Sequence, residues 1–179
     1  MGRLVHALLL GLVGAGIVHI AVLLLVPAYS ERDAWSALSQ QANFYRLVRL
    51  DPPDAPPLIG SLDPLSDAVA CRFDLTDGVM QLHGEGSAPY WSVSVYDRTG
   101  LNIFSLNDRS SPRGRLDFVV ATPTQMISLR NALPPELDES VFVEADIGEG
   151  IAVVRTFAPD ESFEPSVSAW LRGIGCTLH

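Results

Sequence analysis

Lysine is absent from this chain of 179 residues, and all 12 of its basic residues are arginine. This absence excludes mechanisms that need a lysine amine, such as a Walker-type phosphate loop, a Schiff base or a Ser–Lys catalytic pair. Acidic residues number 21, so the net charge is −9 at pH 7. Because the phosphate backbone of a nucleic acid attracts a basic face, we expect no nucleic-acid partner.

Motifs for catalysis and metal binding are missing as well. The sequence contains no HExxH, CxxC, GxSxG, GxGxxG or calcium-loop pattern. Zinc ligands do not cluster, and the only histidines beyond the N-terminal segment are His83 and His179. We therefore predict no metal and no cofactor, and we expect a function without catalysis.

One acidic segment leaves a hydrolase open as an alternative. Paired carboxylates there could bind calcium or act on a glycosidic bond, and His83 could serve as a base. Acids that alternate on the outer face of a hairpin are more often simply solvated, and His83 lies in an ordinary strand pattern. The acids of this segment are Glu136, Asp138, Glu139, Glu144, Asp146 and Glu149.

The longest apolar run predicts a membrane segment. Leu4–Val26 contains no charged residue and, at about 1.5 Å per residue, is long enough to cross a hydrocarbon core of about 30 Å. A cleaved secretory signal has a shorter apolar stretch of about 7–15 residues. We predict a retained anchor over residues 1–28, with cleavage near Ala28 as the alternative.

The charges that flank this run predict its direction. Arg3 precedes the span, whereas both signs of charge follow it from Glu31 to Asp33. The positive-inside rule places the N-terminus in the cytoplasm and the rest of the chain outside. In a bacterium, this means a single-pass inner-membrane protein with its C-terminal domain in the periplasm.

Two features inside the span bear on its packing. Ala7, Gly11 and Ala15 form a stripe of small residues that permits a second helix to approach closely, although such residues are common in membrane spans. His19 is the one ionisable residue deep in the span. Because no other polar residue accompanies it, we favour a hydrogen-bonded neutral imidazole over a functional group.

Residues 29–67 are expected to connect the anchor to the folded domain. The spacing of Trp35, Leu38, Ala42 and Tyr45 predicts a juxtamembrane helix over 31–48, which a kink near Pro27 could join to the span. A proline-rich stretch over 51–57 predicts a stiff connector. The domain itself is expected over 68–179.

Alternating apolar and polar residues predict a mainly β domain of the α+β class. The clearest case is the hairpin of 90–96 and 101–106, joined by a turn at Asp97–Gly100. Thr122–Gln125 is a capping box that starts a short helix. We predict a small antiparallel sandwich or jelly-roll-like domain with two inserted helices. The other expected elements are strands 68–75, 79–83 and 115–121, a hairpin of 140–147 with 151–157, and a helix over 165–174.

Cysteine occurs twice, as Cys71 and Cys176. The two residues lie in the first and last elements of the predicted exported domain. In an oxidising compartment such a pair favours a disulfide, with two buried thiols as the alternative. A redox pair is disfavoured because the CxxC spacing is absent.

A polar loop beside aromatic residues is the candidate ligand site. Aromatic faces next to Asn, Asp and Arg could bind a sugar or an anionic headgroup, unless Trp91 is part of the core. The candidate residues are Tyr90, Trp91, Tyr96, Asn107, Asp108, Arg109 and Arg113.

The stretch from Tyr90 to Asp97, followed by Gly100–Phe104, resembles the bacterial domain-of-unknown-function family numbered twelve-fifty-four. Thr122–Gln125 is similar to the strand-to-helix step of that family, and the likeness covers about 63–157. The resemblance implies a jelly-roll-like β domain in the cell envelope and supplies no catalytic residues. Longer relatives join this domain to a second β-rich domain, which this chain lacks.

These observations favour a non-catalytic envelope accessory that binds another protein through its periplasmic β-domain. A separately encoded β-rich protein is one candidate partner, by analogy with the longer relatives. A carbohydrate- or lipid-binding module at the aromatic loop is the second hypothesis, and a periplasmic hydrolase is the third.

Overall fold

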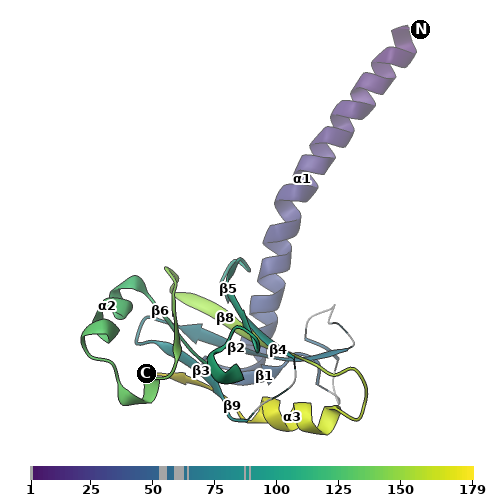
Figure 1. The fold of residues 1–179 in the computed structure, drawn as a ribbon. Coiled ribbons are helices and arrows are strands. Elements are labelled where there is room, and N and C mark those ends of the chain that lie inside the picture. The colour runs from purple at the N-terminus through teal and green to yellow at the C-terminus, as the bar shows by residue number, and fades with distance from the viewer. Residues whose placement is uncertain (1, 53–55, 59–62, 64, 87, 89) are drawn as a thin grey trace.

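The computed structural model describes residues 2–52, 56–58, 63, 65–86, 88 and 90–179, with only the backbone described for 27–33. One long helix is attached to two β-sheets that pack face to face, with short helices at their margins (Figure 1). The predicted α+β class, mainly β and sandwich-like with an N-terminal apolar helix, is confirmed.

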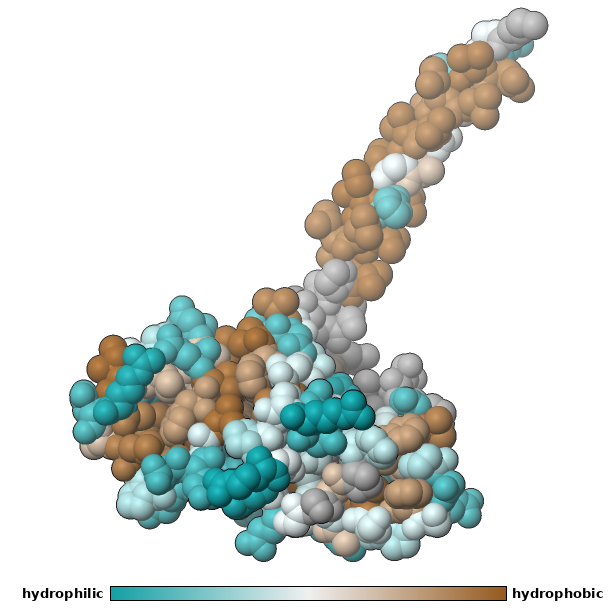
Figure 2. Space-filling view, viewed as in Figure 1, coloured by the Kyte–Doolittle hydropathy of each residue, from teal (hydrophilic) through white to brown (hydrophobic). Residues whose placement is uncertain are grey.

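Helix α1 (Gly2–Gln41) projects away from the sheets for most of its length (Figure 1). Its segment Gly2–Val26 has a mean hydropathy of 2.7, and none of it is buried in the molecule. Figure 2 shows the resulting apolar surface along the helix. Because exposed apolar area of this extent is unfavourable in water, the segment fits a membrane span or a signal sequence.

The C-terminal part of α1 differs from the expected helix over 31–48. The helix runs from the apolar segment to Gln41 in one piece, and Leu47–Arg49 forms strand β1 instead of a helical turn. Tyr45 explains the change, because its N–H donates to the Arg72 carbonyl (2.8 Å) and its hydroxyl donates to the Asp74 carbonyl. These long-range bonds hold the chain against β2, so the helix does not continue beyond Gln41. Residues 53–55 of the predicted proline-rich connector lie outside the described residues.

Sheet A contains five strands and sheet B contains four. All neighbours in sheet A are antiparallel, whereas β6 and β7 of sheet B run parallel. The order in sheet A is β1, β2 (Ser66–Asp74), β8 (Glu149–Phe157), β4 (Trp91–Asp97) and β5 (Asn102–Asn107). The order in sheet B is β7 (Val141–Glu144), β6 (Leu116–Ala121), β3 (Met80–Gly84) and β9 (Ile174–Leu178).

The remaining helices are short. Helix α2 (Pro123–Asn131) begins with the predicted capping box, in which Thr122 and Gln125 each accept from the other's backbone N–H. Helix α3 is Glu164–Arg172. Two single-turn helices of the 3₁₀ type lie at Pro112–Gly114 and Pro135–Leu137.

In the C-terminal part, one sequence prediction is wrong and one strand was missed. The expected final hairpin does not form, because β7 joins β6 in sheet B while β8 lies between β2 and β4 in sheet A. The expected last helix is confirmed as α3, which ends at Arg172, but the strand β9 that follows Gly173 was not predicted. In both cases the strand partner is far away in sequence, so local pattern alone does not select it.

The main core lies between the two sheets. It contains large buried side chains from both, including Phe73 of β2, Trp91 of β4 and Phe118 of β6. Trp91 packs against Trp170 of α3, with ring centroids 6.1 Å apart. Burial of this apolar surface is the main term that stabilises the sandwich.

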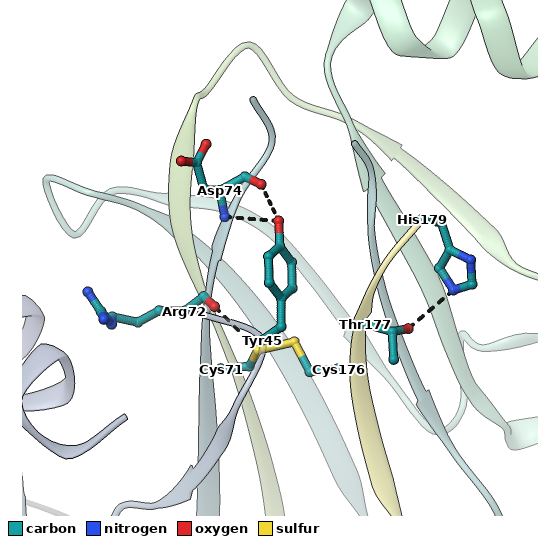
Figure 3. Close-up of a disulfide and its surroundings, with 7 residues drawn as sticks. All are labelled: Tyr45, Cys71, Arg72, Asp74, Cys176, Thr177 and His179. Atoms are coloured by element: carbon teal, nitrogen blue, oxygen red, sulfur yellow. Dashed lines mark hydrogen bonds between the residues drawn. A yellow bond between two sulfur atoms is a disulfide. The ribbon is translucent and has the colours of Figure 1, made fainter. Parts of the chain in front are cut away.

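The predicted disulfide between Cys71 and Cys176 is confirmed. It joins β2 of sheet A to β9 of sheet B, between residues 105 positions apart in sequence (Figure 3). Structural disulfides persist in oxidising compartments, so the bond indicates an extracytoplasmic domain. Tyr45 lies beside it, with its hydroxyl directed at the backbone of Asp74 (Figure 3).

Candidate functional site

An extensive hollow lies on the outer face of sheet A. Its floor follows from the two-residue period of the strands, which places Ile151, Val153 and Arg155 of β8 on this face. The register sets Val153 opposite Ala70 on one side and Ser94 on the other. We call this surface the sheet A groove.

The end of helix α1 forms one wall of the groove. Ala34, Trp35 and Leu38 line it, and Leu38 is only 3% exposed because it packs into the cluster with Leu50 and Val153. The same helix that carries the apolar segment therefore also forms part of the groove. At about 1.5 Å per residue, Trp35 lies about 13 Å along the helix from Val26.

Arginine side chains fix this wall to the sheet. The Arg72 guanidinium lies over the rings of both Trp35 and Phe44, 5.0 and 4.7 Å from their centroids. It also donates to the carbonyl of Ala42 at the end of α1 (3.0 Å). Arg98 lies over Trp35 at 5.3 Å. Such cation–π contacts are worth about 0.5–2 kcal/mol each, so they hold Trp35 in place.

The turn between β4 and β5 forms the opposite wall. Asp97 accepts from the backbone N–H groups of Thr99 (2.8 Å) and Leu101 (3.0 Å) and from the Thr99 hydroxyl (2.7 Å). Partial burial opposes ionisation of Asp97, but these hydrogen bonds outweigh it and the pKa of the carboxyl is lowered. Arg98 pairs with Glu149 of β8 at 2.7 Å, which ties the turn to the floor.

The rim carries two aromatic side chains, Tyr90 and Phe157. Their rings meet edge to face, with centroids 6.2 Å apart. Tyr90 is 59% exposed and has a φ of 57°, an unusual conformation for a bulky residue. Strained backbone with an exposed aromatic ring is found more often at functional sites than elsewhere.

The groove has a volume of about 1110 Å³. Typical small-molecule sites measure about 300–1,000 Å³, so the space exceeds that of a compact ligand. Apolar side chains dominate its lining, from Trp35 on one wall to Leu101 on the other. The volume and the apolar lining suit an apolar chain better than a compact polar molecule.

Polar groups concentrate on one part of the floor. Arg155 lies between Ala68 and Ser92 on the neighbouring strands, and its Nη2 is 3.4 Å from the Tyr96 hydroxyl. Burial alone would raise the pKa of Tyr96, but the hydrogen bond and positive charge of Arg155, with bonds to Ser94 and Asn102, lower it. The positive charge of Arg155 therefore acts on the Tyr96 hydroxyl within the groove.

The structure divides the predicted ligand residues into three groups. Tyr90 and Tyr96 line the sheet A groove. Trp91 is 2% exposed, and its indole N–H donates to the Gly114 carbonyl (3.3 Å), so it belongs to the core. The four residues of the polar loop are Asn107, Asp108, Arg109 and Arg113, and none of them lines the groove.

The polar loop is organised around its own contacts. The Asn107 side chain accepts from the N–H groups of Arg109 (3.1 Å) and Ser110 (3.0 Å). Arg113 pairs with Glu139 at 3.0 Å. These bonds shape the loop and engage the side chains of Asn107 and Arg113.

The groups suggested for a hydrolase do not converge. His83 lies opposite Asp117 on β6, but Asp117 accepts from Gln81 (3.1 Å) and from the Ser140 hydroxyl (2.8 Å). The His83 ring packs against the backbone of Gly175. Ser140 thus donates to the carboxylate itself, whereas a catalytic triad places histidine between the two.

The acidic segment is dispersed as well. Glu144 and Glu149 face different arginines, Arg130 (3.7 Å) and Arg98. Among the described residues, no group of three or more His, Cys, Asp or Glu side chains is placed to hold a metal ion. In the predicted span, Ala7, Gly11 and Ala15 line a shallow hollow on one side of α1.

Sequence reasoning missed the groove because its parts are distant in the chain. One local signal was available in β8, where Ile151 and Val153 on one face alternate with Ala152 and Val154 on the other. A strand that is apolar on both faces is typical of a sheet covered on both sides. That pattern indicates a cover over sheet A but does not identify it.

Comparison with known proteins supports the fold. No protein-family model matches the chain, and no curated protein matches it. The solved VPA0106 protein of Vibrio parahaemolyticus is similar over 84% of this chain, with a TM-score of 0.58 and 12% identity. An uncharacterized protein of Burkholderia cenocepacia is similar over 75% of this chain, with a TM-score of 0.47 and 18% identity.

The matched region is a part of each solved chain. This chain spans 35% of the length of the Vibrio protein and 37% of the length of the Burkholderia protein. At these identities the likeness to the Vibrio protein concerns the fold, and it transfers no ligand or activity.

Proposed function

We propose that this protein is a non-catalytic binding module held at the periplasmic face of a bacterial inner membrane, and that the sheet A groove binds a lipid-like ligand. The observation that carries the proposal is the shared use of α1. The helix with the apolar segment Gly2–Val26 also supplies Trp35 and Leu38 to a wall of the groove. The groove therefore opens beside the membrane surface.

Retention of the N-terminal helix is part of the proposal. The apolar segment continues into the helical turns that pack on sheet A, where Leu38 is buried. A span of 25 residues is longer than the apolar region of an ordinary signal peptide. The disulfide supports an oxidising compartment for the sandwich. The resemblance to the family numbered twelve-fifty-four agrees with a location in the cell envelope. Membership of that family is itself a proposal.

The ligand class follows from the lining. Lipid chains are bound mainly by exclusion of apolar surface from water, at about 0.8 kcal/mol per buried CH₂ group. The groove offers a strip of such surface from Leu101 to Ile151 and Val153. A sugar would instead need several directed polar groups along the same floor.

Photolabelling tests this function. The full chain in detergent is irradiated with a long-chain alcohol that carries a diazirine, and the labelled peptides are identified. We expect labelling of β4 and β8 to exceed labelling of α2. Ser92→Trp, which fills the floor, should reduce the groove labelling at least severalfold. Ile127→Trp on exposed α2 is the matched control and should leave it unchanged.

The proposal fails if labelling is confined to Gly2–Val26, because a detergent-covered span would acquire the probe without any groove. Unchanged labelling of β8 in Ser92→Trp would also contradict it. Thermal unfolding of both tryptophan variants verifies that they remain folded.

A protein partner is the second candidate function. It is favoured by the comparison in which the sandwich makes up about a third of the longer Vibrio chain. A separately encoded β-rich protein would then supply what the longer chain contains in one polypeptide. Co-expression with a protein similar to the remainder of that chain should give a stable complex of fixed stoichiometry. Separate elution of the two proteins would exclude this candidate.

A further inference from the structure

The arginines around the sheet A groove differ in their partners, and this difference bears on the ligand's charge. Arg72 lies against two aromatic rings and donates to the Ala42 carbonyl at the end of α1. Arg98 forms an ion pair with Glu149. Both guanidinium groups are thus occupied in holding the walls of the groove.

Arg155 has no such partner among the described residues. Its only polar contact there is the long hydrogen bond to the Tyr96 hydroxyl (3.4 Å), and it belongs to no ion pair. Two acids line the same groove, but each accepts bonds from its own turn: Asp97 from Thr99 and Leu101, and Asp63 from the Leu65 N–H (3.0 Å).

Arg155 lines the groove without an ion pair among the described residues, whereas Arg98, which also lines it, is paired. The net charge is −9, and acidic residues exceed basic ones by 21 to 12. A half-buried guanidinium with neutral neighbours leaves most of its five N–H donors available. Such a group forms its strongest hydrogen bonds with a carboxylate or a phosphate.

We propose that Arg155 and the Tyr96 hydroxyl bind the carboxylate of a single-chain amphiphile, a long-chain fatty acid, whose apolar chain lies over Val153 and Ile151 toward Trp35. This assignment rests on the proposed function and identifies its ligand class. From Arg155 to Ile151 the strand extends about 13 Å, which gives the chain a continuous apolar path.

The charge balance favours a carboxylate over a phosphate monoester. A carboxylate carries one negative charge, which one guanidinium neutralises. A phosphate monoester carries about 1.5–2 negative charges at pH 7 and would need a second free cation. The two nearby candidates, Arg72 and Arg98, are already engaged.

Matched photoreactive probes test the assignment. Palmitate and the alcohol of the same chain length, each with a diazirine, are compared on the full chain in detergent. The measured quantity is the labelling of β4 and β8 relative to α2. We expect Arg155→Gln to reduce palmitate labelling about tenfold, the effect of losing one charge-assisted hydrogen-bonded pair, while alcohol labelling stays unchanged.

Control variants separate charge from structure. Arg155→Lys should retain part of the preference for palmitate, because it keeps the charge and loses the planar fork. Arg172→Gln removes an exposed arginine at the end of α3, away from the groove, and should behave as the wild type. A competition experiment on the wild-type protein needs no variant. Unlabelled palmitate should reduce labelling of the groove by the alcohol probe far more than the amine of equal length does.

The possible failures are distinct. If both probes label the groove equally and Arg155→Gln changes neither, the carboxylate site is wrong and the lipid-binding groove stands. If neither probe labels the groove in the wild type, the proposed function itself fails. If the amine competes as well as palmitate, Arg155 does not select the charge.

Discussion

On sheet B, the chain itself covers the outer face: Val119 and Ala121 of β6 are buried in a cluster with Leu137 of the 3₁₀ turn, and Met126 and Leu129 of α2 pack against it. On sheet A, the end of α1 covers one part of the outer face with Leu38, and the rest stays open as the groove. Both faces are apolar, so the difference lies in the cover. A small domain that leaves apolar surface open beside a long apolar helix has a surface suited to binding.

The largest expected effect tests whether the two faces belong to one cooperative unit. Replacing both Cys71 and Cys176 with alanine removes the bond between sheets A and B. The chain-entropy model gives a loss of about 4–5 kcal/mol in the free energy of unfolding for a loop of this length. Denaturant unfolding measures it. Hydrogen exchange should show β2 and β3 losing protection together, whereas a loss confined to one sheet would contradict this.

The next effect compares one buried leucine from each face. Leu38→Ala and Leu137→Ala should each lower the free energy of unfolding by about 2–4 kcal/mol, because each leaves a cavity. Leu38→Ala should also change the photolabelling of the groove, since it loosens the α1 wall. Leu137→Ala should leave the labelling as it is. Equal labelling in both variants would indicate that α1 plays no part in the groove.

A smaller effect concerns the cover of sheet B. Thr122→Ala removes the side chain that accepts from the Gln125 N–H at the start of α2. We expect a loss of about 1 kcal/mol, measured by denaturant unfolding. Groove labelling should not change. Thr122→Ser keeps the hydroxyl and serves as the control, and a loss of similar size in both variants would exclude the cap as the cause.

The smallest effect depends on pH and concerns the turn at the groove wall. The pKa of Asp97 is lowered in the folded protein, so its stabilising contribution is present above the ordinary aspartate pKa of about 4. That contribution is lost as the pH falls through the lower, folded value. Asp97→Asn should therefore be less stable than the wild type at neutral pH, and the two should converge in acid.

Solvent screening keeps this difference below about 1 kcal/mol, because the turn is largely exposed. Unfolding followed from pH 7 into the acid range measures it. A difference that grows as the pH falls would contradict the assigned direction.

Elements with local signals were predictable from the sequence. The β4–β5 hairpin follows from the two-residue period around Val93 and Val95 and from the turn chemistry of Asp97–Gly100. The start of α2 follows from Thr122 and Gln125. In each case the residues that determine the structure are within a few positions of one another, so no distant contact is needed to select it.

Elements that depend on distant partners were not predictable. Strand β1 forms where Tyr45 bonds to β2, about 30 positions later in the chain, and β9 forms where it pairs with β3. The groove has the same origin, since Trp35 and Arg155 come from opposite ends of the sequence. Sequence pattern placed Tyr90 and Tyr96 among the candidates but could not distinguish Trp91 as core, because alternation alone does not tell which face of a strand is covered.

The position of β9 in the chain has a consequence for biogenesis. Its residues close sheet B against β3, and Cys176 must meet Cys71 across 105 positions. The sandwich therefore cannot be completed while the ribosome is still adding these residues or while they remain in a translocation channel. Until then, the earlier strands expose the apolar interior and the strand edge that β9 will cover, and such surfaces favour aggregation of an incomplete domain.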